Sequence, residues 1–179
     1  MTVAHKLLTA EEFLKLPEHD NAELIDGEVI PTMPPNPIHG MISFRLANIL
    51  GDWLEGTKAG VFGIDGGFLL KRNPDRVHGP DVWFIRAERM PDVNAEGFWE
   101  MAPDMVAEII SSSDTAEVIK SKLQDYFQAG TQLVWLLYPR FKQVEAHTPD
   151  GRMQIFQAED RLESTLLPGF GCKVSELFL

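Results

Sequence analysis

The amino-acid sequence predicts an α/β fold in which helices flank a mixed β-sheet and antiparallel hairpins extend it. Short apolar runs typical of strands alternate with longer segments of helical periodicity. Turn signals that combine Asp or Pro with Gly separate several of the short runs, as they do in hairpins. No linker or shift of composition divides the chain, so residues 1–179 are expected to form a single domain.

The N-terminal part of the chain carries a helix signal and a hairpin signal. Thr9 and Glu12 have the spacing of a capping box, which predicts a short helix that Pro17 should end. The pair Asp26-Gly27 lies between two extended runs. It predicts an antiparallel hairpin, because this dipeptide tolerates the positive φ angles of tight turns.

A first long helix is expected from Asn36, with Pro37 suited to its first turn. Two short strands are expected afterwards within residues 59–72, around the turn Asp65-Gly66-Gly67. The apolar residues that recur at helical spacing are Ile38, Met41, Ile42, Ile49, Leu50, Trp53 and Leu54.

The second half of the chain predicts further strands and a second long helix. Asp114 is expected to cap this helix and Gly130 to end it. The second long helix has an apolar stripe of Ile119, Leu123, Tyr126 and Phe127. A last helical turn is expected at 174–178. The strands are expected within residues 81–85, 104–110 and 132–138 and in a terminal hairpin within 142–157.

Composition and charge exclude several classes of function. A net charge of −11 argues against broad adhesion to nucleic acid or anionic membranes, although a local basic cleft remains compatible with it. The single Cys172 excludes an intrachain disulfide and a cysteine-built zinc site. The N-terminus lacks the apolar core of a signal peptide, and no run approaches the roughly 18 apolar residues of a membrane span. We therefore expect a cytoplasmic protein without a membrane partner.

Asp81 and Glu108 stand out because each is an ionisable residue at the mouth of, or inside, an otherwise apolar strand. A buried carboxylate needs a cation, a hydrogen-bonding partner or solvent. If the two strands are neighbours, both carboxylates can point into one pocket, where a divalent cation would relieve their repulsion. Such oxygen ligands suit Mg²⁺ or Mn²⁺. The alternative is that Asp81 is a turn residue after Pro80 and that Glu108 pairs with a lysine.

Several short motifs follow one another along most of the chain. They are Glu23 in "ELIDGEVI", His39 after a Pro-rich turn, "PDV" at 80–82, "VAEIIS" at 106–111, "KLQDY" at 122–126 and "AGTQLVWLLYP" at 129–139. No single motif is specific, but the ordered set resembles the Uma-type family of "putative restriction endonucleases", a branch of the PD-(D/E)XK nuclease superfamily. The resemblance runs from about Glu11 to Phe178.

The resemblance implies a restriction-endonuclease-like core in which a helix supplies the first acidic residue and a central hairpin supplies the other two. The superfamily places a lysine two residues after the last of these acids, where this chain has Ile110. In the Uma-type branch the lysine comes from the following helix, and Lys122 matches that position. Lys120 flanks the same apolar stripe, so helical spacing alone does not exclude it. The matching acidic residues are Glu23, Asp81 and Glu108.

The activity that the resemblance implies is metal-dependent hydrolysis of DNA phosphodiester bonds. Asp81 and Glu108 would bind Mg²⁺, or alternatively Mn²⁺, with the backbone carbonyl of Ile109 as a further ligand. Lys122 would orient or help to activate the attacking water. Glu23 would hold that water or a second ion.

Some of these residues also have a purely structural interpretation. Glu23 can be a surface carboxylate of its hairpin, and Lys122 a helix lysine whose stem covers apolar surface. His39 is a second candidate for contacts with phosphate or water, or else a local hydrogen-bonding residue. Asp104, in the second "PD", is expected to lie outside the site.

DNA as a partner requires positive potential confined to a cleft, because the chain as a whole is acidic. Two alternatives to a DNA endonuclease therefore stay open: a noncatalytic nuclease-fold binding module, and a hydrolase of a small phosphorylated substrate. A homodimer formed through the terminal strands is a further hypothesis. The basic residues that could line a cleft, or form a solvated face, are Lys71, Arg72, Arg76, Arg86 and Arg89.

Overall fold

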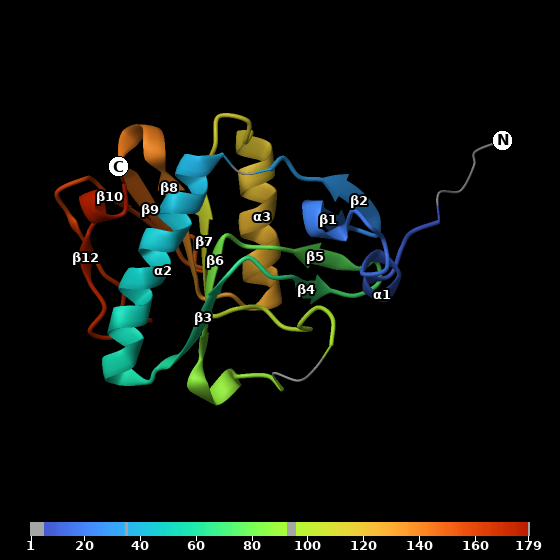
Figure 1. Cartoon of the computed structure of the whole chain (residues 1–179), viewed down its shortest axis with the longest axis horizontal. Coiled ribbons are helices and arrows are strands. Elements are labelled where there is room, and N and C mark those ends of the chain that lie inside the picture. The colour runs from blue at the N-terminus through green and yellow to red at the C-terminus, as the bar shows by residue number, and fades with distance from the viewer. Residues whose placement is uncertain (1–5, 35, 93–95, 179) are drawn as a thin grey trace.

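The computed structural model describes residues 6–34, 36–92 and 96–178 and shows two main β-sheets with two long helices (Figure 1). The larger sheet contains β3 (Gly60–Ile64), β6 (Val82–Arg86), β7 (Met105–Ile109), β8 (Leu133–Tyr138), β9 (Gln143–His147) and β10 (Met153–Phe156). The smaller sheet contains β1 (Ala22–Ile25), β2 (Glu28–Pro31), β4 (Phe68–Lys71) and β5 (Arg76–His78). The helices are α1 (Ala10–Phe13), α2 (Pro37–Thr57) and α3 (Ala116–Ala129). The 3₁₀ turns are η1 (His19–Asn21), η2 (Ala87–Arg89), η3 (Pro139–Phe141) and η4 (Val174–Glu176), and β11 (Arg161–Leu162) pairs with β12 (Cys172–Lys173).

The larger sheet is mixed, as the sequence predicts. Its strand order is β10-β9-β8-β7-β6-β3. The neighbours β7 and β8 are parallel, and α3 makes the connection between them, which is the usual way to join parallel strands. The other neighbouring pairs in this sheet are antiparallel, so the predicted α/β class is confirmed.

The two long helices cover opposite faces of the larger sheet (Figure 1). Successive side chains of a strand point to opposite faces. Trp135 of β8 accordingly packs in the same cluster as Leu46 of α2, whereas its neighbour Val134 packs with Tyr126 of α3. In β7 the alternation places Ala107 with the α2 cluster and therefore turns the next residue, Glu108, toward α3.

The smaller sheet has the order β2-β1-β5-β4 and its own apolar core. Phe13 of α1 packs there with Leu24 of β1 and Val77 of β5. Leu70 of β4 packs instead against the cluster that contains α3. Helix α3 is therefore in contact with both sheets.

The strongest local signals of the sequence are confirmed. Thr9 is the N-cap of α1, with both hydrogen bonds of the capping box. Asp26 and Gly27 have φ angles of 50° and 80° in the turn between β1 and β2. Asn36 caps α2, and Gly130 ends α3 at a φ of 111°. These residues specify conformations that few other residues adopt without strain.

Other local expectations are wrong. The N-cap of α3 is Thr115, whose hydroxyl accepts from the amide of Val118, and not Asp114. The Asp114 carboxylate instead accepts from the amide of Ser111 and closes the turn before the helix. Both residues are good N-caps, so the sequence could not separate them.

The strands β3 and β4, expected together within residues 59–72, belong to different sheets. The chain leaves the larger sheet at Ile64 and enters the smaller one at Phe68, where β4 pairs with β5. Strand β5 was not predicted, since its three residues are too few to show an alternation.

Helix α2 buries a narrower stripe than expected. Ile42, Leu46 and Leu50, which are four residues apart, are buried in the core. Ile38 and Met41, which the sequence placed in the same stripe, are 51% and 46% exposed. Within the described ranges, neither α2 nor any other helix has the length and apolar character that a membrane crossing requires.

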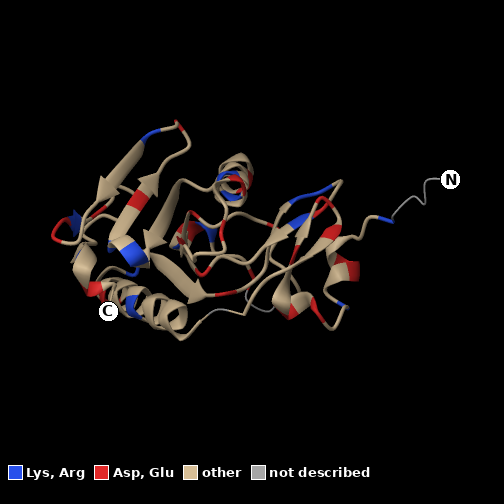
Figure 2. Ribbon diagram, turned by 90° about the horizontal axis from the view of Figure 1, so that it is seen from above, with Lys and Arg blue, Asp and Glu red and all other residues tan. Residues whose placement is uncertain are grey.

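The basic residues that were considered for a cleft all form ion pairs with carboxylates, and Figure 2 shows acidic and basic positions close together over much of the ribbon. Their positive charge is therefore neutralised locally. Asp104 is fully buried and lies outside the site, as expected. The pairs are Lys71 with Asp26, Arg72 with Glu11, Asp75 and Glu100, Arg76 with Asp26 and Asp125, Arg86 with Glu88 and Asp104, and Arg89 with Asp104.

Asp104→Asn is expected to lower the free energy of unfolding by about 3 kcal/mol, because a buried carboxylate that holds two guanidinium groups loses its charge. Urea unfolding followed by circular dichroism measures this. The control is Asp150→Asn, which removes a carboxylate from an exposed pair with Arg152 and should leave the midpoint unchanged. Equal losses in the two variants would contradict a structural role for Asp104.

Candidate active site

Asp81 and Glu108 lie opposite one another at one end of the larger sheet. The antiparallel register of β6 and β7 pairs Val82 with Ala107, so that the preceding Asp81 faces Glu108. Directly opposed residues project from the same face, with Cβ atoms about 4.5–5.5 Å apart. The two strands are therefore neighbours, and the carboxylate of Glu108 lies on the face that α3 covers.

Asp81 connects the end of β7 to the first turn of α2. Its Oδ2 accepts a hydrogen bond of 2.6 Å from the backbone amide of Ile109, and it lies 3.1 Å from Nε2 of His39. The N-cap at Asn36 fixes the first turn of α2 and so fixes the position of His39. The hydrogen bond to Asp81 raises the pKa of His39 above its ordinary value, against the opposing effect of burial.

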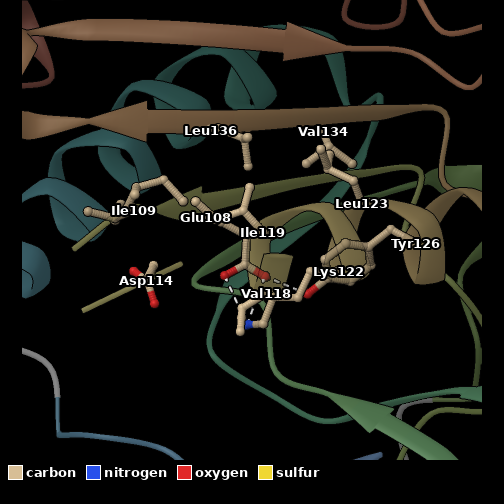
Figure 3. Close-up of a pocket in the computed structure, with 11 residues that line it drawn as sticks. Glu108, Ile109, Asp114, Val118, Ile119, Lys122, Leu123, Tyr126, Val134 and Leu136 are labelled. Atoms are coloured by element: carbon tan, nitrogen blue, oxygen red, sulfur yellow. Dashed lines mark hydrogen bonds and ion pairs between the residues drawn. The ribbon is translucent and has the colours of Figure 1, made fainter. Parts of the chain in front are cut away.

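Glu108 is almost fully buried between β7 and α3 (Figure 3). The hydroxyl of Tyr126 donates a hydrogen bond of 2.6 Å to its Oε1, and Nζ of Lys122 lies 3.3 Å from its Oε2. Burial raises the pKa of Glu108 to about 7, since the Lys122 charge offsets only part of this effect and the carboxylates of Asp81 and Glu23 add to it. The carboxylate lines a cavity of about 40 Å³ whose other walls are mainly apolar, which explains the desolvation.

Lys122 also contacts Glu23, which comes from the smaller sheet. Its Nζ lies 3.0 Å from Oε1 of Glu23. Burial opposes the charge of Lys122, but Glu108 and Glu23 outweigh it and raise the pKa of the ammonium group. Burial likewise raises the pKa of Glu23, but the neighbouring His78 and Lys122 reverse this and lower it to about 2. Glu23 lies on β1, so the expectation of a helix for the first acidic residue is wrong, whereas the hairpin predicted from Asp26-Gly27 is correct.

The structure separates the two candidate lysines. Lys122 points from α3 into the cluster of carboxylates, as Figure 3 shows for Glu108. Lys120 is exposed and forms no ion pair with a described residue. Tyr126 follows Lys122 by one helical turn and therefore lies on the same face. That spacing was a usable signal for Tyr126, which the sequence assigned only to the apolar stripe.

A second layer of charged groups behind Glu23 was not predicted. His78 is 2% exposed; its Nε2 lies 2.8 Å from Oδ2 of Asp125, and its Nδ1 lies 3.0 Å from Oε1 of Glu23, outside hydrogen-bond geometry. Asp125 also pairs with Arg76. Burial lowers the pKa of His78, but Asp125 and Glu23 outweigh it and raise the value. The available signal was Asp125 itself, an acid beside Tyr126 on the buried side of α3.

The residues present fit a small divalent cation. Within ranges 6–34, 36–92 and 96–178, no three side chains of His, Cys, Asp or Glu gather as a metal cluster. Asp81 and Glu108 offer oxygen ligands only, and burial together with the nearby carboxylates of Asp81 and Glu23 raises the pKa of Glu108 although Lys122 lies beside it. Oxygen ligands supplemented by water are the usual surroundings of Mg²⁺. The role of the Ile109 carbonyl as a third protein ligand stays a prediction.

The metal-free protein is expected to lose stability as the pH rises from about 4.5 to 6.5. The pKa of Glu108 is higher in the folded state than its ordinary value of 4.5, so the folded state binds the proton more tightly over this window. Glu23 titrates below the window, because its pKa is lowered. Urea unfolding at a series of pH values measures the slope, and Glu108→Gln should flatten it. An identical slope in wild type and Glu108→Gln would contradict the assignment.

Comparisons with known proteins identify the fold and the family of the chain. A crystal structure from Anabaena variabilis, described as that of "a putative nuclease belonging to DUF820", matches with a TM-score of 0.79 and 22% sequence identity, over 95% of this chain and 97% of that one. This likeness establishes the fold. No curated protein is similar enough to this chain to count as a match. The model of the Uma2 family, described as "Putative restriction endonuclease", matches residues 10–175. The chain therefore belongs to the Uma2 family of restriction-endonuclease-like proteins.

Proposed function

We propose that this protein is a metal-dependent endonuclease that hydrolyses phosphodiester bonds of DNA. The observation that carries the proposal is the pair of carboxylates from Asp81 and Glu108, opposed across two central strands, with the Lys122 ammonium 3.3 Å from one of them. Membership of the Uma2 family and the nuclease fold support a nuclease role. The divalent ion and the DNA substrate belong to the proposal.

In this proposal Asp81 and Glu108 hold one Mg²⁺ or Mn²⁺, with the Ile109 carbonyl and waters as further ligands. A bound ion would polarise the scissile phosphate and lower the pKa of a coordinated water. The protein positions its two carboxylates in advance: Ile109 and His39 fix that of Asp81, and Tyr126 fixes that of Glu108. Such preorganisation avoids the cost of arranging the ligands during the reaction.

Lys122 is assigned to positioning and charge stabilisation. Its pKa is raised by Glu108 and Glu23, so it is an ammonium ion at neutral pH and cannot accept a proton from water. It can orient a water or a phosphate oxygen by donating hydrogen bonds. Glu23, ionised because of its low pKa, is an acceptor on the other side of Lys122 and can hold the same water.

One observation favours an alternative. Lys122 is already paired with both Glu23 and Glu108, and such a closed network also suits a noncatalytic binding module. A hydrolase of a small phosphorylated substrate is the other alternative, and it would need less positive surface than DNA. Cleavage and metal binding together separate these possibilities from the endonuclease.

Supercoiled plasmid incubated with the protein and Mg²⁺ or Mn²⁺ should be nicked or linearised. Asp81→Ala and Glu108→Ala are each expected to reduce the rate at least about 100-fold, because each removes an oxygen ligand of the ion. Agarose gel electrophoresis over a time course measures the rate. Cutting at the wild-type rate by both variants would show that the nuclease site lies elsewhere.

Lys122→Ala is expected to reduce plasmid cutting about 100-fold, since an ammonium group close to the reacting atoms is lost. The matched variant Lys120→Ala removes an exposed lysine half a turn earlier on the same helix and should stay within a few-fold of wild type. The ratio of the two rates is the measurement. The assignment of Lys122 fails if both variants lose activity equally.

Isothermal titration calorimetry of the wild type should detect binding of Mn²⁺, and binding should vanish in Glu108→Gln. The Gln side chain keeps an oxygen for the Tyr126 hydrogen bond but lacks the negative charge. A wild type without affinity for Mn²⁺ or Mg²⁺ would favour the noncatalytic module. Metal binding without plasmid cutting would favour either the noncatalytic module or the small-substrate hydrolase.

A further inference from the structure

The turn between β8 and β9 places an aromatic ring between two cations. Phe141, the last residue of η3, is 65% exposed, and the guanidinium carbon of Arg140 lies 5.9 Å from the centre of its ring. Lys142 follows with a φ of 48°, in the left-handed region. Arg140 and Lys142 are both exposed. A single exposed apolar side chain is ordinary by itself, so its position and the surrounding charges decide what it means.

This turn lies at the same end of the sheet as the candidate active site. The parallel register pairs Ile109 of β7 with Leu137 of β8, so both strands end together. Tyr138 is the last residue of β8, and η3 follows it at once. Neighbouring strands are about 4.8 Å apart, so η3 begins about one strand spacing away from the end of β7. In Figure 1 it is the orange turn above β8 and β9, at the end of the sheet where α2 and α3 begin.

Among the described residues, neither of the two flanking cations has a carboxylate partner. The lysines and arginines that a basic cleft was expected to use are paired with carboxylates, so they have little capacity to bind a polyanion. Arg140 and Lys142 differ from them in this respect and flank an exposed ring beside the site. In the part of the chain that the structure describes, the Lys and Arg side chains without a carboxylate partner are Lys15, Arg45, Lys58, Lys120, Arg140 and Lys142.

We propose that Arg140, Phe141 and Lys142 form a nucleic-acid contact, in which Phe141 stacks on an unpaired base and the two cations contact the adjoining phosphates. The inference rests on the proposed function and narrows its substrate class. A base can stack on a protein ring only if it has left the duplex stack. The favoured substrate is therefore DNA with unpaired bases beside the cleaved bond, such as a single strand or a gapped duplex.

Binding is tested with the full chain carrying Asp81→Asn, so that no cutting occurs. The probes are a single-stranded oligonucleotide that contains 2-aminopurine, whose fluorescence falls when the base stacks, and the same strand annealed to its complement as a duplex. Adding Phe141→Ala should weaken binding about tenfold and abolish the fluorescence change, whereas Phe141→Trp should preserve both. The matched control is Phe44→Ala, because Phe44 of α2 is also exposed, at 60%.

The cationic part of the contact is tested through the salt dependence of binding. Lys142→Gln should reduce the slope of log affinity against log salt concentration by about one. Lys58→Gln is the matched control, since Lys58 is likewise unpaired and has a φ of 51°, but it follows the far end of α2. Its slope should equal that of the parent.

The outcomes separate this inference from the proposed function. If the wild type cuts plasmid while Phe141→Ala and Lys142→Gln bind the oligonucleotide like the parent, the nucleic-acid contact is wrong and the endonuclease stands. If Phe141→Ala weakens duplex and single strand equally without any fluorescence change, stacking is wrong. If the wild type neither cuts plasmid nor binds either oligonucleotide, both proposals fail.

Discussion

The site depends on the ion pairs that the ammonium group of Lys122 forms with two buried carboxylates. Glu23 belongs to the smaller sheet and Glu108 to the larger one, and Lys122 lies 3.0 Å from the first and 3.3 Å from the second. Without the lysine, two buried negative charges would face each other across the boundary of the sheets. Removal of one partner from a buried ion pair is costly for this reason. The same helix carries Asp125, which pairs with Arg76 of the smaller sheet, so α3 joins the two sheets through charge as well as through apolar packing.

The site has a rigid part, which contains Asp81 and Glu108, and a supporting part, which contains Glu23, His78 and Asp125. Asp81 directly precedes β6 and Glu108 lies on the adjacent β7, and the backbone hydrogen bonds between these strands fix their separation. Glu23 is held from the other sheet and is backed by His78 and Asp125. Burial raises the pKa of Glu108, and the neighbouring carboxylates of Asp81 and Glu23 add to this effect. A cation bound from solution, as proposed, would lower the cost of ionising this buried group.

Much of the fold followed from local signals, because they report conformations that depend on one or two residues. The turn at Asp26-Gly27 and the helix end at Gly130 need positive φ angles, and both are where the sequence indicated. The neighbourhood of Asp81 and Glu108 was expected only if their two strands were adjacent, and the pairing of β6 with β7 fulfils that condition. Strand β5 depends on pairing with distant strands instead, and the choice of Thr115 over Asp114 depends on the turn that Asp114 closes with Ser111.

The supporting contacts could not be predicted from sequence for the same reason. His78 and Asp125 are 47 residues apart, and they meet only because β5 lies against α3. The exposure of Phe141 likewise depends on which elements cover the end of the sheet. Spacing did provide one unused signal, because Tyr126 follows Lys122 by four residues and so shares its helix face.

The hydrogen bonds of the two central carboxylates determine which oxygens face a bound ion. Asp81 uses Oδ2 for both Ile109 and His39, and Glu108 uses Oε1 for Tyr126 and Oε2 for Lys122. Bidentate binding of an ion by either carboxylate would therefore require breaking an existing contact. Calcium favours six to eight oxygens and often takes carboxylates in bidentate fashion, whereas magnesium accepts single oxygens and keeps several waters. If the protein binds a divalent ion as proposed, the hydrogen bonds that hold the carboxylates in place would favour magnesium over calcium.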